Sequence, residues 1–376
     1  MNHTTPHIYE DRRTLVEIHT ADLHFGAFDP KLQYEILMDQ MINKIRDLHF
    51  DAFFINGDIF HHKFMSNSDV IMYASLFIEQ VVMLCRKNNA TLVILHGTGS
   101  HDANQLKLFY HYIGTLDIRI VEHTQFEYIK GSRVLCIPEE YGMGEEYYNN
   151  FLHNSGIYDM VVLHGAVKGS IYGCNEVDLD SSKAPVFDIS CFDNCTGPII
   201  CGHVHVSHCY QDHIYYSGSP LRWQFGEETM KGFIVCLYNA MTGQYYINLE
   251  EVVSFRYDTI CLDELSHKDP REIIEYINSC KARGIDYLKV KFSEPNERTN
   301  VVKRYYSNIN DIVIDAADVS FSQSIKNNAE KNDKFKEYDY ILNTNMSPEE
   351  IFVRYVNQCK GCEFITVDDL IKILSD

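Results

Sequence analysis

The chain has 376 residues, 45% of them hydrophobic and 23% charged, which is the composition of an ordinary globular protein. Its 53 acidic residues outnumber 33 Lys and Arg residues, and the formal net charge of −20 argues against non-specific nucleic-acid binding by the chain as a whole. No apolar run approaches the roughly 18 residues that span a bilayer, and the polar N-terminus does not resemble a signal peptide. The 12 cysteines follow no framework spacing, so we expect reduced thiols and an intracellular, cytoplasmic protein.

Short apolar strands alternate with amphipathic helices over the first 250 residues. Brief β-branched or aromatic runs bounded by turn residues predict buried strands at 15–18, 52–55, 92–95, 134–137, 160–163 and 199–201. Apolar residues at helical spacing predict helices over 33–48 and 69–87. The apolar stripe of the second helix is broad, which favours two packing partners, with a second subunit as one candidate. Residues 231–252 predict a β-hairpin that turns at Asn239–Gly243. Together these elements predict an α/β fold of sheets covered by helices.

The composition changes after about residue 255. Segments 269–295 and 301–321 each predict one helix and one strand, and so a small α+β domain. Residues 323–346 are rich in Lys, Asn and Asp and predict a linker. A helix restarts beyond it, with Ser347 as N-cap and Pro348 at the first helical position, and a second short helix follows. These two helices are either a terminal cap on the core or a docking element for a partner. The expected domains are therefore 1–255, 256–322, the linker 323–346, and the helical segment 347–376.

Histidine and aspartate recur at the carboxyl ends of the predicted strands. They are Asp22, His24, Asp58, His61, His62, His101, Asp102, His164, His203 and His205. Any one of them alone is more often a structural residue, but open α/β sheets place their sites where such strand ends converge. Imidazoles mixed with carboxylates, without a thiolate, suit two divalent ions such as Mn²⁺ or Fe²⁺ better than a structural zinc. Two ions about 3.5–4 Å apart stabilise an in-line displacement at phosphorus. The sequence therefore indicates a two-metal phosphoesterase.

Asp22-x-His24, Gly57-Asp58, Gly-x-His101-Asp102, His164 and Gly202-His203-x-His205 resemble the full motif series of the calcineurin-like metallophosphoesterases. Two further stretches, "GDIFH" and "YYSGSPLRWQFGEETMKGFIV", are similar to the Mre11/SbcD nucleases of that superfamily. The similarity covers about residues 14–240, and the C-terminal third matches only in layout. The short length is similar to that of phage recombination endonuclease subunits, which would place the protein in the host cytoplasm.

The resemblance implies a four-layer metallophosphoesterase sandwich, two mixed sheets flanked by helices, with a small α+β cap domain and a C-terminal helical pair. It implies a Mn²⁺-dependent DNA exonuclease and endonuclease that processes double-strand ends in recombination. The helical pair would bind an SMC-like ATPase of the Rad50 or SbcC type. A homodimer formed through the N-terminal helices is expected. Two Mn²⁺ ions are the expected cofactors, with Fe²⁺ or Mg²⁺ as alternatives.

The resemblance also assigns roles to single residues. The implied metal ligands are Asp22, His24 and His205 for one ion, His164 and His203 for the other, and Asp58 for both. His101 would stabilise or protonate the leaving 3′-oxygen, and His61 would help to place the scissile phosphate. Lys63 and Arg222 lie in loops near the motifs and are candidates for DNA contacts, or else solvated surface charges. Trp223 is expected to pack its loop rather than to stack on a base.

One position departs from the family's pattern. The fourth motif of the family is Gly-Asn-His, and the Asn oxygen ligates the second metal, whereas here Ser100 stands directly before His101. A hydroxyl is a shorter and weaker ligand, so we expect a looser second site that needs more Mn²⁺. Two other functions stay open at this point. One is a metallophosphatase acting on phosphoproteins or small phosphoesters, and the other is a catalytically weak DNA-end scaffold, which only Ser100 favours.

Overall fold

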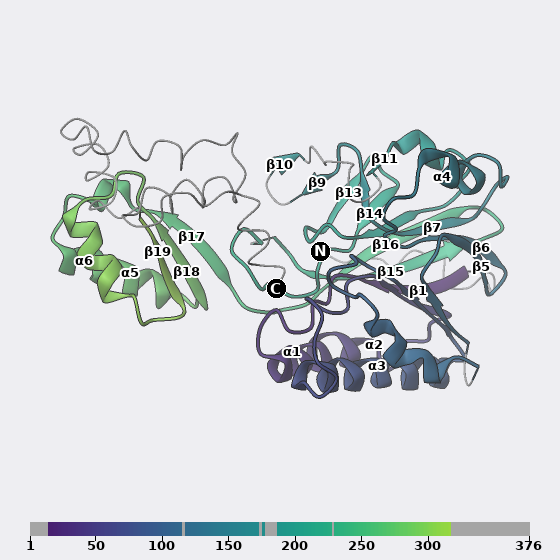
Figure 1. Cartoon of the computed structure of the whole chain (residues 1–376), viewed down its shortest axis with the longest axis horizontal. Coiled ribbons are helices and arrows are strands. Elements are labelled where there is room, and N and C mark those ends of the chain that lie inside the picture. Colours follow the sequence, from purple (N-terminus) through teal and green to yellow (C-terminus); the bar gives the residue numbers. More distant parts are fainter. Residues whose placement is uncertain (1–13, 115–116, 173–174, 177–185, 228, 317–376) are drawn as a thin grey trace, which may run out of the picture. The chain divides into compact units, whose positions relative to one another are not determined.

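The structure is a computed structural model that describes residues 14–114, 117–172, 175–176, 186–227 and 229–316 (Figure 1). Contacts divide the chain into two compact units near residue 259, and the segment Cys280–Lys289 belongs with the first unit. The expected linker 323–346 and helical segment 347–376 lie outside the described residues.

The first unit contains two large mixed sheets, each of six strands. The first sheet has the order β16 (Gln244–Glu251), β15 (Gly232–Asn239), β1 (Thr14–Thr20), β2 (Ala52–Asn56), β3 (Thr91–Leu95) and β4 (Ile118–Val121). The second has the order β13 (His208–Tyr210), β14 (Ile214–Tyr216), β12 (Ile199–Gly202), β7 (Met160–His164), β6 (Ser132–Ile137) and β5 (Gln125–Ile129). Two short pairs join β9 (Ile171–Tyr172) with β10 (Asn175–Glu176), and β8 (Ala166–Val167) with β11 (Val186–Phe187). Strands β1 to β4 run parallel to one another, as do β6, β7, β12 and β14.

The central strands β2, β3 and β7 are buried along their whole length because both faces of each sheet are covered there. In β2, Phe53 and Ile55 belong to a cluster with the helices, whereas Ala52 and Phe54 belong to a second cluster that contains residues of both sheets. This alternation follows from the two-residue period of a strand. A third cluster joins the second sheet to α4 (Glu145–Leu152), through Leu152 and other apolar side chains.

Helices α1 (Pro30–Leu37), α2 (Asn43–Ile45) and α3 (Asp69–Asn88) lie along one side of the sheet that contains β1 and β15 (Figure 1). A π-helical turn, Met38–Ile42, joins α1 to α2 and keeps the apolar side chains of the expected helix 33–48 on the buried face. The buried residues of α3 all belong to the cluster with the first sheet, so packing within one chain accounts for its broad apolar stripe. None of the described helices has the length and apolar character that a membrane crossing requires.

A three-stranded sheet follows, in the order β17 (Tyr257–Cys261), β18 (Tyr287–Lys291) and β19 (Ile312–Asp315), with helices α5 (Pro270–Lys281) and α6 (Glu297–Tyr305). The two helix–strand pairs expected from the sequence are confirmed. Helix α6 begins before the expected segment because Asn296 and Thr299 form a capping box at its start. Short 3₁₀ helices at Gln105–Tyr112, Ile189–Phe192 and Asp263–Leu265 complete the described structure.

The six buried strands expected from the sequence are confirmed as β1, β2, β3, β6, β7 and β12, each within two residues of its expected bounds. The hairpin around Asn239–Gly243 is confirmed as β15 paired with β16. The mixed α/β fold with two large sheets and covering helices is therefore correct. Cys136, Cys201 and Cys236 are buried in strands, as expected of thiols that serve as small apolar side chains.

Candidate metal centre

Six strand ends bring polar side chains together in the first unit. Strands β1, β2 and β3 are parallel neighbours in one sheet, and β6, β7 and β12 are parallel neighbours in the other. Because parallel strands share one carboxyl edge, the residues that follow them converge from both sheets. The structure thereby brings together Asp22, His24, Asp58, Thr98, His101, Glu139, His164, His203 and His205.

The backbone at this edge adopts rare conformations. Asp22, His24, Asp58 and His203 have positive φ angles of 52°, 46°, 54° and 80°. Residues with side chains seldom adopt this left-handed region, and they keep it where the surrounding structure holds them. Gly57 has a φ of 89°, and a Cβ placed on it would lie 2.2 Å from Nδ1 of His164. Strain of this kind, concentrated at adjoining polar residues, is typical of a functional site.

Asp22, His24 and His205 form the first ligand group, with one potential ligand atom of each within 4.8 Å of the others. The Nε2 atoms of His24 and His205 lie 3.0 Å apart. Both oxygens of Asp22 accept from the backbone N–H of His203, at 3.0 and 3.1 Å, which fixes the carboxylate. Two imidazole nitrogens and a carboxylate that point at one place are a donor set for a divalent cation.

The orientation of His205 is set by Glu227. Nδ1 of His205 lies 2.8 Å from Oε1 of this carboxylate, which can only accept, so the proton lies on Nδ1 and Nε2 keeps its lone pair. Glu227 pairs in turn with Lys231, at 3.5 Å, and the fully buried ammonium of Lys231 donates to the His205 carbonyl and to Ser219. This carboxylate–histidine arrangement is the usual support of a metal-binding imidazole.

We therefore expect Glu227→Gln to weaken the binding of a divalent metal ion, with Mn²⁺ as the probe, about 10- to 100-fold. The variant should also lose stability, because it leaves the buried ammonium of Lys231 without a counter-charge. The double variant Glu227→Gln with Lys231→Met should recover much of the free energy of unfolding but not the Mn²⁺ affinity. Calorimetric Mn²⁺ titration and thermal melting measure the two effects separately. A Glu227→Gln protein with unchanged Mn²⁺ affinity would contradict this role.

Glu139, His164 and His203 form the second ligand group, again with their potential ligand atoms within 4.8 Å of one another. Nδ1 of His164 donates to the Asn56 carbonyl at 2.6 Å, so Nε2 is available to the site. Oδ2 of Asp58 lies 3.5 Å from this Nε2 and 3.7 Å from Nε2 of His24. Asp58 therefore stands between the two ligand groups, where one carboxylate can bind two ions.

The electrostatics of the site favour positive charge. Burial lowers the pKa of His24 well below its usual value although Asp58 opposes this, and the neutral ring is the form that binds a metal. Burial would raise the pKa of Asp58, but His164 and then His24 lower it, so Asp58 is ionised. The pKa of His164 is raised well above its usual value, against burial, chiefly by Asp58. Carboxylates that draw a proton to His164 also attract a divalent ion.

Asp102 supports the Asp58 loop from behind. Its buried carboxylate accepts from the backbone N–H groups of Asp58, Ile59, Phe60 and Gly97, at 2.9–3.2 Å. Four backbone donors are too many to allow a freely moving side chain. Asp102 therefore positions the loop that carries Asp58 and does not belong to either ligand group.

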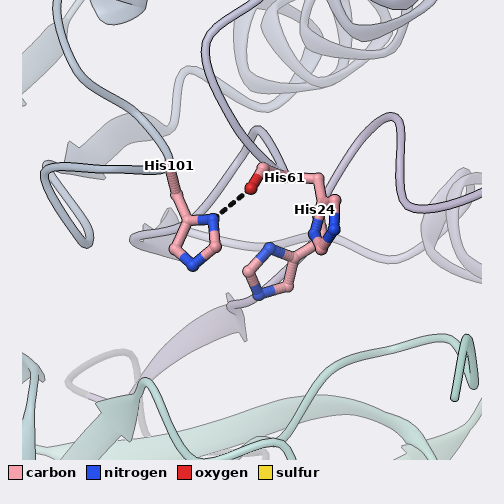
Figure 2. Close-up of side chains that lie close together, drawn as sticks. All are labelled: His24, His61 and His101. Carbon is pink, nitrogen blue, oxygen red and sulfur yellow. Dashed lines mark hydrogen bonds between the residues drawn. The ribbon is translucent and has the colours of Figure 1, made fainter. Parts of the chain in front are cut away.

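His24 of the first ligand group also lies close to His61 and His101 (Figure 2). Nδ1 of His101 donates to the backbone carbonyl of His61, which leaves Nε2 as the nitrogen available for proton transfer. The ring of Trp223 lies 5.0 Å from that of His61 and 5.3 Å from that of His24. Trp223 thus contacts the histidine cluster.

Three further residues were singled out from the sequence. Ser100 is exposed, whereas most residues of the two ligand groups are buried. The guanidinium of Arg222 donates to the backbone carbonyls of Glu227, Thr229 and Phe255, which gives it a structural role in holding this loop. Lys63 is exposed in the loop that follows His61 and His62.

Sequence reasoning missed Thr98, Glu139 and Glu227. The Thr98 hydroxyl lies 3.2 Å from Oδ2 of Asp58 and 3.0 Å from Oε2 of Glu139. The backbone N–H of Thr98 donates to Oδ1 of Asp58 at 2.6 Å. Thr98 would have been found if the Gly-Asn pair of the family's fourth motif had been matched to Gly97-Thr98, and not to the residue directly before His101. Glu139 follows the β6 strand, so the strand-end rule applied to the other strands also predicts it.

The chain matches no protein-family model and no curated protein. One solved crystal structure is similar over 63% of this chain and 100% of its own, with 13% identity and a TM-score of 0.35. A cold-active protein-tyrosine phosphatase of a psychrophilic Shewanella sp. is similar over 62% of this chain and 80% of its own, with 13% identity and a TM-score of 0.28. The His, Asp and Glu groups of the site are consistent with a metal cofactor.

Proposed function

We propose that the protein is a two-metal DNA nuclease of the Mre11/SbcD type, with the four-layer metallophosphoesterase sandwich that this implies. The observation that carries the proposal is the position of Asp58 between two ligand groups, 3.7 Å from His24 and 3.5 Å from His164. Mn²⁺ is the proposed ion because the donor set mixes carboxylate oxygens with imidazole nitrogens and contains no thiolate. The motif series in the sequence is the second support.

The residues of the candidate metal centre would each have a part in phosphodiester hydrolysis. Two divalent ions, when bound, polarise the phosphoryl group and lower the pKa of a water molecule. Asp22, His24 and His205 would hold the first ion, His164 and His203 the second, and Asp58 both. The His101 ring, fixed by its Nδ1 donation to His61, would protonate the leaving oxygen through Nε2. Trp223 and His61 would bound the site on the side of the first ion.

The test is degradation of linear double-stranded DNA by the purified chain with Mn²⁺ and without it. Cleavage that requires the metal supports the proposal. Turnover of a chromogenic phosphodiester without any cleavage of DNA, with or without an ATPase partner, would instead favour a metallophosphatase. Absence of both activities in a protein that binds Mn²⁺ would favour the scaffold.

The acidic chain should bind DNA weakly without a partner. With 53 acidic residues against 33 Lys and Arg, few phosphates can be neutralised. We therefore expect the affinity for a DNA duplex to fall about tenfold or more between roughly 50 and 200 mM salt, as the release of counterions from a few contacts predicts. Fluorescence anisotropy measures this directly. Tight binding that does not change with salt would contradict it.

The proposed partners are DNA ends, a second copy of the chain and an SMC-like ATPase of the Rad50 or SbcC type. The ATPase would supply much of the DNA-binding surface that the acidic chain lacks. Addition of such a partner should raise DNA affinity at a given salt concentration.

A further inference from the structure

Glu139 lies at the carboxyl end of β6, directly after Pro138. Its backbone N–H donates to the His96 carbonyl at 3.2 Å, which ties the end of β6 to the end of β3 in the other sheet. The residue is only 4% exposed. A glutamate so buried needs partners for both oxygens, and their identity indicates what the side chain does.

The two oxygens of Glu139 have different surroundings. Oε1 accepts from the Tyr141 hydroxyl, which fixes the rotation of the carboxylate. Oε2 lies 3.0 Å from the Thr98 hydroxyl, 3.2 Å from Nδ1 of His203 and 3.6 Å from Nε2 of His164. One oxygen is therefore held in place while the other points at the histidines of the second ligand group.

The atoms around His164 require a positive charge. Because Nδ1 of His164 donates to the Asn56 carbonyl, the neutral ring presents a lone pair at Nε2. Oδ2 of Asp58 and Oε2 of Glu139 face that lone pair at 3.5 and 3.6 Å. Three acceptor atoms that converge at these distances repel one another unless a proton or a metal cation lies among them, and a divalent ion meets this need while the ring stays in the neutral form that binds metal.

We propose that Glu139 is a ligand of the second metal ion and that, with the Thr98 hydroxyl beside it, it takes the place of the asparagine amide in the metallophosphoesterases that the sequence resembles. This inference rests on the proposed function. A carboxylate adds a full negative charge where the family has a neutral oxygen, so the second site should bind Mn²⁺ firmly. The exposed Ser100 then has no part in the site.

The assignment is tested by measuring Mn²⁺ binding to the full chain. Calorimetry gives the affinity, and the loss of the free Mn²⁺ signal in electron paramagnetic resonance gives a second measure of the bound ion. We expect wild type to bind two ions. Glu139→Gln keeps the size of the side chain and the contact with Tyr141. It should lower the Mn²⁺ affinity of one of the two sites by about 100-fold or more, which exceeds the loss expected when a residue that only supports a ligand is changed. Glu139→Asp, which keeps the charge but shortens the reach, should have an intermediate affinity.

The neighbouring residue supplies a matched control. Glu140 is also buried, but its carboxylate bonds to Thr124, Tyr147 and His123, outside the ligand groups. Glu140→Gln and Ser100→Ala should both bind two ions as wild type does. Thermal melting of each metal-free variant checks that it is folded.

Three outcomes would overturn the assignment. If Glu139→Gln bound two ions with wild-type affinity, Glu139 would not be a metal ligand. The proposed nuclease function would still stand, whether or not the activity of this variant fell. An equal loss of affinity in Glu140→Gln would assign the effect to general loss of buried charge. Failure of the wild type to bind Mn²⁺ would overturn both this inference and the proposed function.

Discussion

Asp58→Asn is expected to abolish the proposed paired metal site while leaving the fold intact. Asp58 has a φ of 54°, a conformation that asparagine tolerates better than most residues, and the amide oxygen can still accept from the Thr98 N–H. The variant loses the charge that lies between His24 and His164. Metal ions contribute several kcal/mol of transition-state stabilisation, so DNA cleavage should fall by about 1,000-fold or more.

Thermal melting gives a readout of Asp58→Asn that does not depend on activity. A ligand that binds only the folded state raises the melting temperature, so Mn²⁺ should stabilise the wild type and should stabilise Asp58→Asn much less. Asp47→Asn makes the same chemical change at a side chain that is 96% exposed, and it should behave as the wild type does. Equal stabilisation of all three proteins by Mn²⁺ would show that Asp58 does not bridge metal ions.

His101→Gln is expected to lower the rate of DNA cleavage by about 10²- to 10⁴-fold, the usual contribution of a general acid. The glutamine cannot deliver a proton to the leaving oxygen at neutral pH, although its amide can still donate to the His61 carbonyl that now accepts from Nδ1. Mn²⁺ binding should stay at the wild-type stoichiometry and affinity. Single-turnover cleavage and a parallel Mn²⁺ titration measure the two quantities.

The titration matters because His101 also lies close enough to His24 and His61 to form a potential ligand group. A loss of Mn²⁺ affinity in His101→Gln would make His101 a ligand and would end its assignment as a proton donor. His111→Gln is the matched control, since His111 is exposed and its Nδ1 likewise contacts a backbone carbonyl, that of Leu108. It should cleave DNA at the wild-type rate.

Much of the fold could be predicted from the sequence because its central strands are continuous apolar runs. Strands such as β2 and β7 are buried on both faces, so a short apolar segment bounded by turn residues identifies them without any knowledge of the partner strand. The π-helical turn at Met38–Ile42 was not predictable, because it changes the phase of a helix without interrupting the apolar pattern.

The candidate site was predictable where a strand end carried a histidine or aspartate in a recognisable motif. Glu139 follows a predicted strand but was missed because only histidine and aspartate were sought at the strand ends. Its contacts with His203 and Thr98, which follow strands of different sheets, appear only in the folded chain. Glu227 was missed as a functional residue because its partner His205 is 22 positions away, and only the folded chain places their side chains 2.8 Å apart. Spacing along the sequence identifies residues at one strand end, but not those that join two strand ends.

The most direct test of a paired metal site is anomalous diffraction at the manganese edge from crystals of the full chain grown with Mn²⁺. We expect two anomalous peaks about 3.5–4 Å apart, with Asp58 between them. Asp22, His24 and His205 should surround one peak, and Glu139, His164 and His203 the other. A single peak, or peaks that do not include Asp58, would contradict the two-metal account on which the proposed nuclease depends.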